Sequence, residues 1–537
     1  MASLKYSILE TASEHGFGEA SLSAYFLVNR LLRNDPLTQV DESLLEYTPE
    51  VSQRKGAVLL PMIPGTIVNN YRGCIIAHAF RTRGYEPVIL HCGRGLSRCL
   101  RRWIVRDSPA SCDRCAVEGR RTLDAFGLDY LTVSELAPSA DPTIETDDLE
   151  SVEYRGIDLS EFALATTRRY FQKYAIDLSD DYEREVYTDM LKNGITLVDV
   201  VEELVRTRDV VATIVMEDHY VQGGVPLAVS KKHGVPGYSI ENGLRDGTIL
   251  FGSTDNRNTF PFFTDEEVLD RRMNTPLTEA QRERIDTLVE NRIEGGEGVT
   301  YQYSSDAARS IDTNEYRAVA GMFTNLIWDA SLSTGDFAPY TDVLEWIQET
   351  VEAFADQPDV GLVVKTHPAE TAHGTQQPVG EYIRATCGPL PPNIDILPPD
   401  TPVNTYQMMH DVDVGVVYNT TVGLEMAYQG YPVVVGGDTH YRGLGFTHDP
   451  ETKSAYRDTL GAIADLETTP EMQERAQRYM YFLMLQKSLD FPFLSANENA
   501  TDIRPQPVAY DDIKPGNEVF DLIVEKMAAG EPVVREP

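Results

Sequence analysis

The order of strand-like and helix-like segments constrains the fold of this chain more than any other feature. Apolar β-like runs alternate with helical stretches in both halves. In the first half these are 57–62, 73–83, 86–91, 209–216, 224–233 and 235–240, and in the second 360–364, 412–418, 421–429 and 432–436. Repeated strand–helix–strand units favour parallel sheets that are covered by helices. We therefore predict an α/β protein with two doubly wound, Rossmann-like domains.

The length sets how many domains to expect. A chain of 537 residues is too long for one ordinary hydrophobic core. We predict four parts, with an interdomain linker near 294–316. They are an N-terminal extension (1–56), a first domain (57–300) with a Cys-rich insert (91–120), a second domain (316–485), and a C-terminal tail (486–537) with a helix that crosses back.

The charge of the chain is unusual. There are 84 acidic and 47 basic residues, which leaves a formal net charge of −37. An acidic, lysine-poor surface resembles that of proteins adapted to high salt, where screening weakens self-repulsion. It also argues against a nucleic-acid partner. Because no apolar run is long enough to span a bilayer and the first residues lack the apolar core of a signal peptide, we predict a cytoplasmic protein.

The strongest local motif is the segment 411–437. A buried strand ends near Tyr418, and Asn419, Thr420 and Thr421 then precede a short helix that carries Glu425 one turn in. A helix N-terminus offers N–H groups to an anion, and Glu425 could accept hydrogen bonds from a ribose. The alternative is an ordinary helix cap with a solvated glutamate.

Two further segments follow predicted strands. The segment VVKTHPAE (363–370) places Lys365, His367 and Glu370 at a strand end, where a phosphate ligand or an acid role fits Lys365 and His367. A structural histidine is equally compatible. The segment GGDTHYRGLGFT (436–447) is glycine-rich, and its Tyr441 or Arg442 could stack on or pair with a ligand. The alternative is a plain turn-rich loop.

Taken together, KTHP, NTTVGLEMAYQGYPVVV and GGDTHYRGLGFT resemble the capsular polysaccharide synthesis glycosyltransferases. The resemblance extends to FTNLIWD (323–329), which contains Asn325, and to DVLEWIQET (342–350). It implies a GT-B-like fold with a cleft between two domains, a nucleotide-sugar donor mostly on the C-terminal domain, and no obligatory metal. Under this resemblance, the donor phosphates and nucleoside are lined by His367, Lys365, Thr420, Thr421 and Glu425, and His367 is also a candidate catalytic residue. The predicted donor-binding set further includes Glu370, Asn419, Tyr441 and Asn325. The Thr-Thr pair replaces the commoner Ser-Ser and keeps both hydroxyls.

The N-terminal half matches this family less well, so the catalytic base is sought from chemistry. Inverting transfer needs a carboxylate or histidine that deprotonates the acceptor hydroxyl. Glu217, Asp218 and His219 directly follow the strand 209–216 and are the candidates for this role. The alternative is three solvated loop residues in an acid-rich protein. The loop 64–70 could also contact donor or acceptor, or be a simple Pro-Gly turn.

The cysteines suggest a different kind of site. Cys92, Cys99, Cys112 and Cys115 occupy 24 residues and end in a CxxC pair, a spacing typical of structural zinc. The first two intervals are irregular, so His91 or Cys74 could substitute. Reduced thiols and an iron–sulfur cluster are the alternatives. Five arginines in the same insert could meet an anionic, lipid-linked acceptor or form a solvated helix face: Arg94, Arg98, Arg101, Arg102 and Arg106.

These features favour a glycosyltransferase that moves a sugar from a nucleotide-sugar donor to a surface polysaccharide or glycolipid acceptor. A lipid-linked acceptor would place it peripherally at the inner face of the membrane. Two rival hypotheses remain. One is a related enzyme, such as a polyol-phosphate transferase or sugar epimerase. The other is a non-catalytic assembly partner of a polysaccharide complex, which would have no need for the phosphate-directed side chains of KTHP and NTTVGLE.

Overall fold

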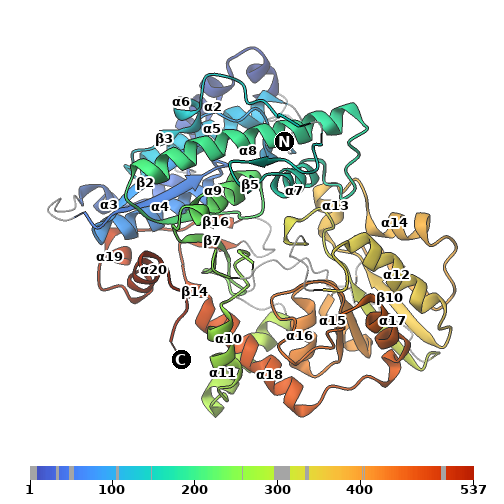
Figure 1. Ribbon diagram of the computed structural model, residues 1–537. Helices are drawn as coiled ribbons and strands as arrows, with labels where there is room; N and C mark the ends of the chain where they lie inside the picture. The colour runs from blue at the N-terminus through green and yellow to red at the C-terminus, as the bar shows by residue number, and fades with distance from the viewer. Residues whose placement is uncertain are drawn as a thin grey trace. The chain divides into compact units, whose positions relative to one another are not determined.

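A computed structural model describes residues 9–31, 35–47, 54–103, 108–146, 148–256, 258–294, 315–332, 338–401, 403, 405–496 and 503–536. The chain divides into two compact units (Figure 1). Unit 1 comprises residues 1–171, 175–263 and 487–537, and unit 2 comprises 172–174 and 264–486. Within the described residues, no helix is long and apolar enough to cross a membrane.

Unit 1 is built on a seven-stranded sheet with the order β14-β8-β7-β6-β1-β2-β3. The strands β3, β2, β1, β6 and β7 run parallel, whereas β8 and β14 are antiparallel additions at one edge. The bounds are β1 Ala57–Met62, β2 Glu86–His91, β3 Leu131–Thr132, β6 Val210–Val215, β7 Gly237–Asn242, β8 Thr248–Ser253 and β14 Leu489–Asp490. This order confirms the predicted doubly wound sheet and adds two antiparallel strands to it.

Helices cover both faces of this sheet because alternate residues of each buried strand point to opposite sides. In β1, Val58 and Leu60 pack with residues of α4 and α5, while Ala57 and Leu59 pack with residues of α7, α8 and α9. The helices are α2 Gly18–Leu31, α4 Ile67–Thr82, α5 Pro109–Ala125, α7 Ser160–Phe171, α8 Asp181–Thr207 and α9 Val221–Lys232. Helix α4 begins six residues before the predicted start, because Thr66 caps it by accepting a hydrogen bond from the Asn69 N–H.

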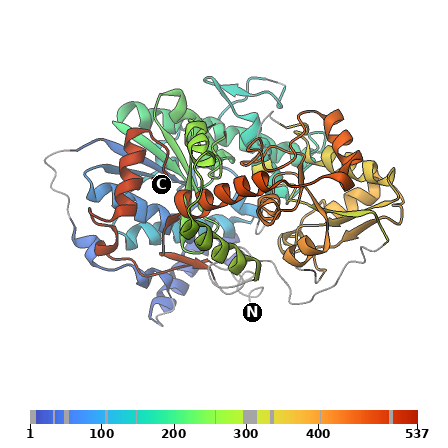
Figure 2. The same cartoon turned by 90° about the horizontal axis from the view of Figure 1, so that it is seen from below.

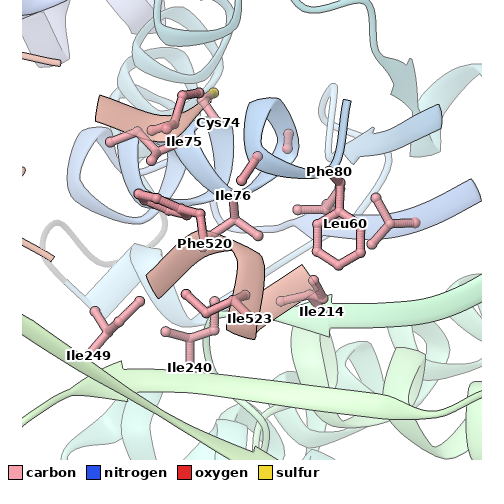
Figure 3. Packing of buried hydrophobic residues seen from close by; sticks show 14 of the residues in the cluster. Leu60, Cys74, Ile75, Ile76, Phe80, Ile214, Ile240, Ile249, Phe520 and Ile523 are labelled. Atoms are coloured by element: carbon pink, nitrogen blue, oxygen red, sulfur yellow. The ribbon is translucent and has the colours of Figure 1, made fainter. Parts of the chain in front are cut away.

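The last residues of the chain complete the core of unit 1. Helix α20 (Glu518–Ala529) is drawn in red beside the blue and green elements in Figures 1 and 2. Its Phe520 and Ile523 are buried in the same cluster as Leu60 and Ile76 (Figure 3). The tail after Lys487 is therefore an integral part of unit 1 and contributes both a strand and a helix to it.

Unit 2 has a five-stranded, fully parallel sheet with the order β11-β10-β9-β12-β13. The bounds are β9 Ala318–Phe323, β10 Val360–Lys365, β11 Ile394–Leu397, β12 Val414–Val417 and β13 Val433–Val435. One face packs on helices α12 (Val343–Ala355), α14 (Val379–Thr386) and α17 (Lys453–Gly461). Helix α16 (Val422–Gln429) matches the predicted helix within one residue at its start. The predicted second doubly wound sheet is confirmed.

Unit 2 begins before the linker that the sequence suggested. Helices α10 (Glu266–Met273) and α11 (Glu279–Glu294) belong to unit 2, where they contact α18 (Pro470–Tyr481). Arg282 on α11 bonds the Glu474 carboxylate at 2.7 Å, and Arg478 on α18 donates to the carbonyl of Met273 at 2.7 Å. These polar contacts join helices that are far apart in the sequence. The periodicity of strands and helices therefore could not predict that α10 and α11 belong to unit 2.

Candidate functional site

The sheet of unit 2 brings four strand ends to one edge. Starting from the central strand β9, the chain adds β10 and β11 on one side and then β12 and β13 on the other. The register pairs Phe323 with both Lys365 and Val417, so the residues after these strands lie side by side. Ligands of doubly wound sheets bind at such a reversal of strand order, outside the carboxyl ends. Three predicted segments meet at this edge.

Lys365 ends β10 at this edge. Its side chain is buried, with 4% of the residue exposed, and burial lowers the pKa of its ammonium group. Among the described residues, none forms an ion pair or hydrogen bond with this ammonium group. Asp400 and Glu370 attract this ammonium group without forming an ion pair with it, so an anionic ligand here would supply the missing short-range interaction.

His367 follows Lys365 by two residues. Its Nδ1 accepts a hydrogen bond from the Ala369 N–H at 3.1 Å, and burial lowers its pKa to about 4. The imidazole is therefore neutral at pH 7 and carries its proton on Nε2. In this state His367 can donate a hydrogen bond to a phosphate oxygen, whereas the imidazolium form needed for a strong acid is scarce.

Glu370 and Asn325 add two buried polar atoms. Glu370 accepts a hydrogen bond from the Val379 N–H at 3.3 Å through Oε1, while its Oε2 has no partner among the described residues. Burial raises the pKa of this carboxyl to about 7. The Oδ1 of Asn325, which follows β9, is likewise buried without a partner within the described structure. Both residues were predicted donor ligands, and that role stays a prediction.

The loop after β12 is supported by the glycine-rich segment 436–447. Tyr441 is fully buried and donates its hydroxyl hydrogen to the carbonyl of Thr420 at 2.7 Å. The Thr420 hydroxyl accepts weakly from the Val422 N–H at 3.4 Å, and Thr421 makes no side-chain cap. Because the Tyr441 ring packs on His440 and Phe446, it offers no face to a ligand. The predicted stacking role of Tyr441 is corrected to one of supporting the loop that contains Asn419.

Arg442 and Glu425 are also engaged inside the protein. Arg442 donates to the carbonyls of Val435 and Pro450, which corrects its predicted pairing with a ligand. Glu425 accepts from Arg292 Nε at 2.7 Å, and only 3% and 9% of the two side chains are exposed. This buried ion pair uses one carboxylate oxygen of Glu425, so any ribose bond would have to involve the other. The sequence could not reveal the pair because its members are 133 positions apart.

Unit 1 has a strand-order reversal of its own, between β1 and β6. The loop after β1 leads to α4, and the loop after β6 carries Glu217, Asp218 and His219 and leads to α9. Two glycines of α9 allow it to lie against this second loop. A Cβ atom on Gly223 would be 1.6 Å from the Glu217 carbonyl oxygen, and one on Gly224 would be 2.5 Å from that of Asp218. The three predicted base candidates thus lie at the position where a doubly wound sheet binds ligands.

Asp218 and His219 form a dyad. His219 Nδ1 lies 2.8 Å from Asp218 Oδ1, and Phe260 packs edge-on against the imidazole. Burial raises the pKa of Asp218, but the interactions with His219 outweigh burial, and the net pKa is lowered. An ionised Asp218 fixes the His219 tautomer with the proton on Nδ1, which leaves Nε2 as the nitrogen that can accept a proton.

Glu241 and Gln222 at this edge were missed from the sequence, whereas Asn70 belongs to the segment 64–70 that was considered as a loop contacting donor or acceptor. Glu241 in β7 lies near Arg72, Glu217 and Asp218, and burial raises its pKa to about 7. Asn70 of α4 and Gln222 of α9 are buried, and neither amide group has a hydrogen-bond partner within the described structure. Asn70 and Gln222 both lie in helices that follow the switch-point strands. That placement was the only available signal, since a polar residue in a helix is ordinarily exposed.

The four cysteines of the insert line one pocket with His91 at the end of β2, but they do not assemble the predicted zinc site. The described residues contain no group of three or more His, Cys, Asp or Glu side chains placed to hold a metal. Burial raises the pKa of Cys92 and Cys115 to about 12. The Cys115 sulfur accepts from the Gly65 N–H at 3.1 Å, and none of the six cysteines forms a disulfide with another described residue. Reduced thiols, one of the alternatives considered, describe what the structure shows.

Two arginines of the insert, Arg94 and Arg98, are paired with carboxylates instead of being available to an anion. Arg94 pairs with Glu19 and Asp113, and Arg98 pairs with Glu185 and Asp189 at 3.2 Å. Arg101 lines the cysteine pocket. Arg106 and the side chain of Arg102 lie outside the described residues. The positive charges of Arg94 and Arg98 are thus balanced internally, which explains why a basic cluster in so acidic a chain need not attract an anion.

The strand orders define a two-unit α/β protein with one ligand-binding switch point in each sheet. Residues 314–467, which contain the whole switch-point edge of unit 2, match the family described as Capsule polysaccharide biosynthesis protein. The family resemblance drawn from the sequence is thereby confirmed over this segment. No protein of curated function matches the chain.

Solved structures give distant likenesses only. The β-Kdo 2,7-transferase of KpsC from Thermosulfurimonas dismutans has 19% identity and a TM-score of 0.31, covering 49% of this chain and 79% of its own. The β-Kdo 2,4-transferase of the same KpsC has 12% identity and a TM-score of 0.36, covering 60% and 88%. A putative UDP-N-acetylglucosamine 2-epimerase from Listeria monocytogenes has 12% identity and a TM-score of 0.24, covering 79% and 91%.

Proposed function

We propose that this protein is a glycosyltransferase of capsule polysaccharide biosynthesis, which moves a sugar from a nucleotide-sugar donor to a polysaccharide or glycolipid acceptor. The observation that carries the proposal is Lys365, whose ammonium group is attracted by Asp400 and Glu370 but forms no ion pair or hydrogen bond with any of the described residues. It lies at the strand-order reversal of unit 2, inside the segment that matches the capsule family. A donor diphosphate would pair with it, and His367 would donate its Nε2 hydrogen to a phosphate oxygen.

The dyad of unit 1 fits the other half of the reaction. In the proposed step, Nε2 of His219 takes the proton of an acceptor hydroxyl while the acceptor oxygen forms a bond to the anomeric carbon of the donor sugar. The bond between that carbon and the phosphate oxygen breaks, and the nucleotide leaves with its electron pair. Asp218 is a positioning residue, because it holds the tautomer and stabilises the imidazolium ion that forms.

A screen of nucleotides and nucleotide sugars by thermal shift tests the donor, since a bound ligand raises the melting temperature. We expect at least one nucleotide to stabilise the wild type, and His367→Ala to abolish sugar transfer while the protein remains folded. The exposed His410 on the same unit gives a matched control, and His410→Ala should leave transfer unchanged.

Three results would contradict the proposal. Absence of stabilisation by every nucleotide would remove the donor site and favour an assembly partner without catalysis. Full activity of His367→Ala would remove the role of this residue. Interconversion of a free nucleotide sugar without any acceptor would favour an epimerase.

A further inference from the structure

More polar side chains lie near the strand-order reversal of unit 1 than the transfer of one proton requires. The residues concerned all follow or end the central strands β1, β6 and β7. They are Asn70, Glu217, Asp218, His219, Gln222 and Glu241, and we call them the unit 1 polar cluster. Three of them carry carboxyl groups and two carry amides. This inference rests on the proposed function, because it concerns which acceptor that reaction uses.

The cluster is poor in positive charge. Glu241 interacts with Glu217 and Asp218, both of which raise its pKa further after burial, and Arg72 is the guanidinium group that lowers it. Arg72 is itself buried and donates to the Asn242 side chain. The insert arginines Arg94 and Arg98 are held by carboxylates of their own. A phosphate or carboxylate placed in the cluster would therefore meet several negative charges in a poorly solvated setting.

The amides indicate what the cluster can bind. Asn70 and Gln222 are 0% and 1% exposed, and neither has a hydrogen-bond partner within the described structure. The Oδ2 atom of Asp218, 7% exposed as a residue, is also without a partner there. An amide both donates and accepts, and a carboxylate accepts, so this set is matched by hydroxyl groups, which do both. Buried groups of this kind are costly unless a ligand or water bonds them.

We propose that the unit 1 polar cluster binds the acceptor through the hydroxyl groups of a neutral sugar residue and disfavours an acceptor whose reacting residue carries a phosphate or a carboxylate. The amides of Asn70 and Gln222 bond hydroxyls next to the reacting one, and His219 takes the proton of the reacting hydroxyl. Above the pKa of Glu241, which is about 7, the carboxylates of Glu217 and Glu241 repel an anionic group and so set the specificity for a neutral residue.

The test measures binding of methyl glycosides of neutral hexoses and of the corresponding uronic acids to the full-length protein by saturation-transfer NMR at about pH 8.5, where Glu241 is ionised. We expect the wild type to bind a neutral glycoside at least tenfold more tightly than its uronic acid counterpart. Asn70→Leu should lower the affinity for the neutral glycoside by about tenfold, which corresponds to the loss of two neutral hydrogen bonds. Glu241→Gln should reduce the discrimination, because it removes the charge and keeps the shape. The exposed Glu203 on α8 supplies the control variant Glu203→Gln, which should behave as the wild type.

The stability of the variants separates a binding role from a structural one. Loss of an unpartnered amide should leave the melting temperature of Asn70→Leu equal or higher, whereas a structural amide would lower it. If that variant does not fold, the Glu241→Gln arm decides. Equal or tighter binding of the uronic acid by the wild type would overturn the inference, as would no binding of any neutral glycoside. The rise in melting temperature caused by a nucleotide, measured on the same sample, tests the proposed function separately from acceptor binding.

Discussion

Substitution of Lys365 by methionine should move protein stability and nucleotide affinity in opposite directions. The ammonium group is 4% exposed as a residue and has no ion-pair or hydrogen-bond partner among the described residues. Methionine is of similar length and carries no charge, so the substitution fills the same space and removes a buried cation that Asp400 and Glu370 compensate only in part. The free protein should become more stable, and the protein should lose the charge that holds the donor phosphates.

The expected magnitudes follow from the same observation. A hydrogen bond to a charged group contributes about 1.5–3 kcal/mol, so nucleotide affinity should fall roughly 10- to 150-fold. With ligand at about 100 times the wild-type Kd, binding stabilises the wild type by about 2.7 kcal/mol; a 100-fold weaker site retains about 0.4 kcal/mol. Removing the buried charge should stabilise the free protein by about 1 kcal/mol, or roughly 2–4 °C in Tm for a unit of this size.

Thermal denaturation with and without the nucleotide found in the screen gives both quantities from one protein sample. Lys453→Met is the matched control, because Lys453 is a half-exposed lysine of unit 2 that pairs with Glu345. The control should keep the full ligand-induced shift. A Lys365→Met protein that is less stable and still shows the wild-type shift would refute the reasoning, since Lys365 would then support the fold and not the ligand.

Three further results are expected. Stability should fall as pH rises from about 4.5 to 7, because the folded state holds a proton on Glu370 (pKa about 7) after the unfolded chain has lost it; Glu370→Gln should reduce this fall in urea titrations at pH 5 and 8. Arg292→Met should cost about 3–5 kcal/mol in urea unfolding by leaving Glu425 buried without its cationic partner, and the double variant with Glu425→Leu should recover most of it. Raising ionic strength from about 0.1 to 1 M should increase Tm, because screening weakens the repulsion of a chain with net charge −37; an unchanged Tm would contradict the high-salt interpretation.

Periodicity predicted the two sheets well because each buried strand is a continuous apolar run with glycine or polar residues after it. The ends of β10 and β12 were located within one or two residues, so Lys365, His367 and Thr420 were placed correctly at one edge. Their grouping follows from parallel strands whose carboxyl ends coincide.

Contacts between distant segments could not be predicted in this way. The ion pair of Glu425 with Arg292 and the bond from Tyr441 to Thr420 depend on tertiary packing, which changes the role of a side chain without changing its sequence neighbours. The same limit explains the cysteines. A CxxC spacing permits a metal site, but only the packing of α5 decides that Cys115 is buried, which raises the pKa of its thiol to about 12.

The participation of α20 in the core of unit 1 has a consequence for biosynthesis. Phe520 and Ile523 pack with strands that emerge from the ribosome hundreds of residues earlier, and the whole of unit 2 is translated in between. During translation, the apolar face of the unit 1 sheet therefore stays uncovered where α20 will lie until residues 518–529 have emerged. Unit 2, which is almost contiguous in the chain, can complete its own sheet first. A nascent chain halted before Glu518 would expose this face, which makes it a natural target for chaperones and proteases.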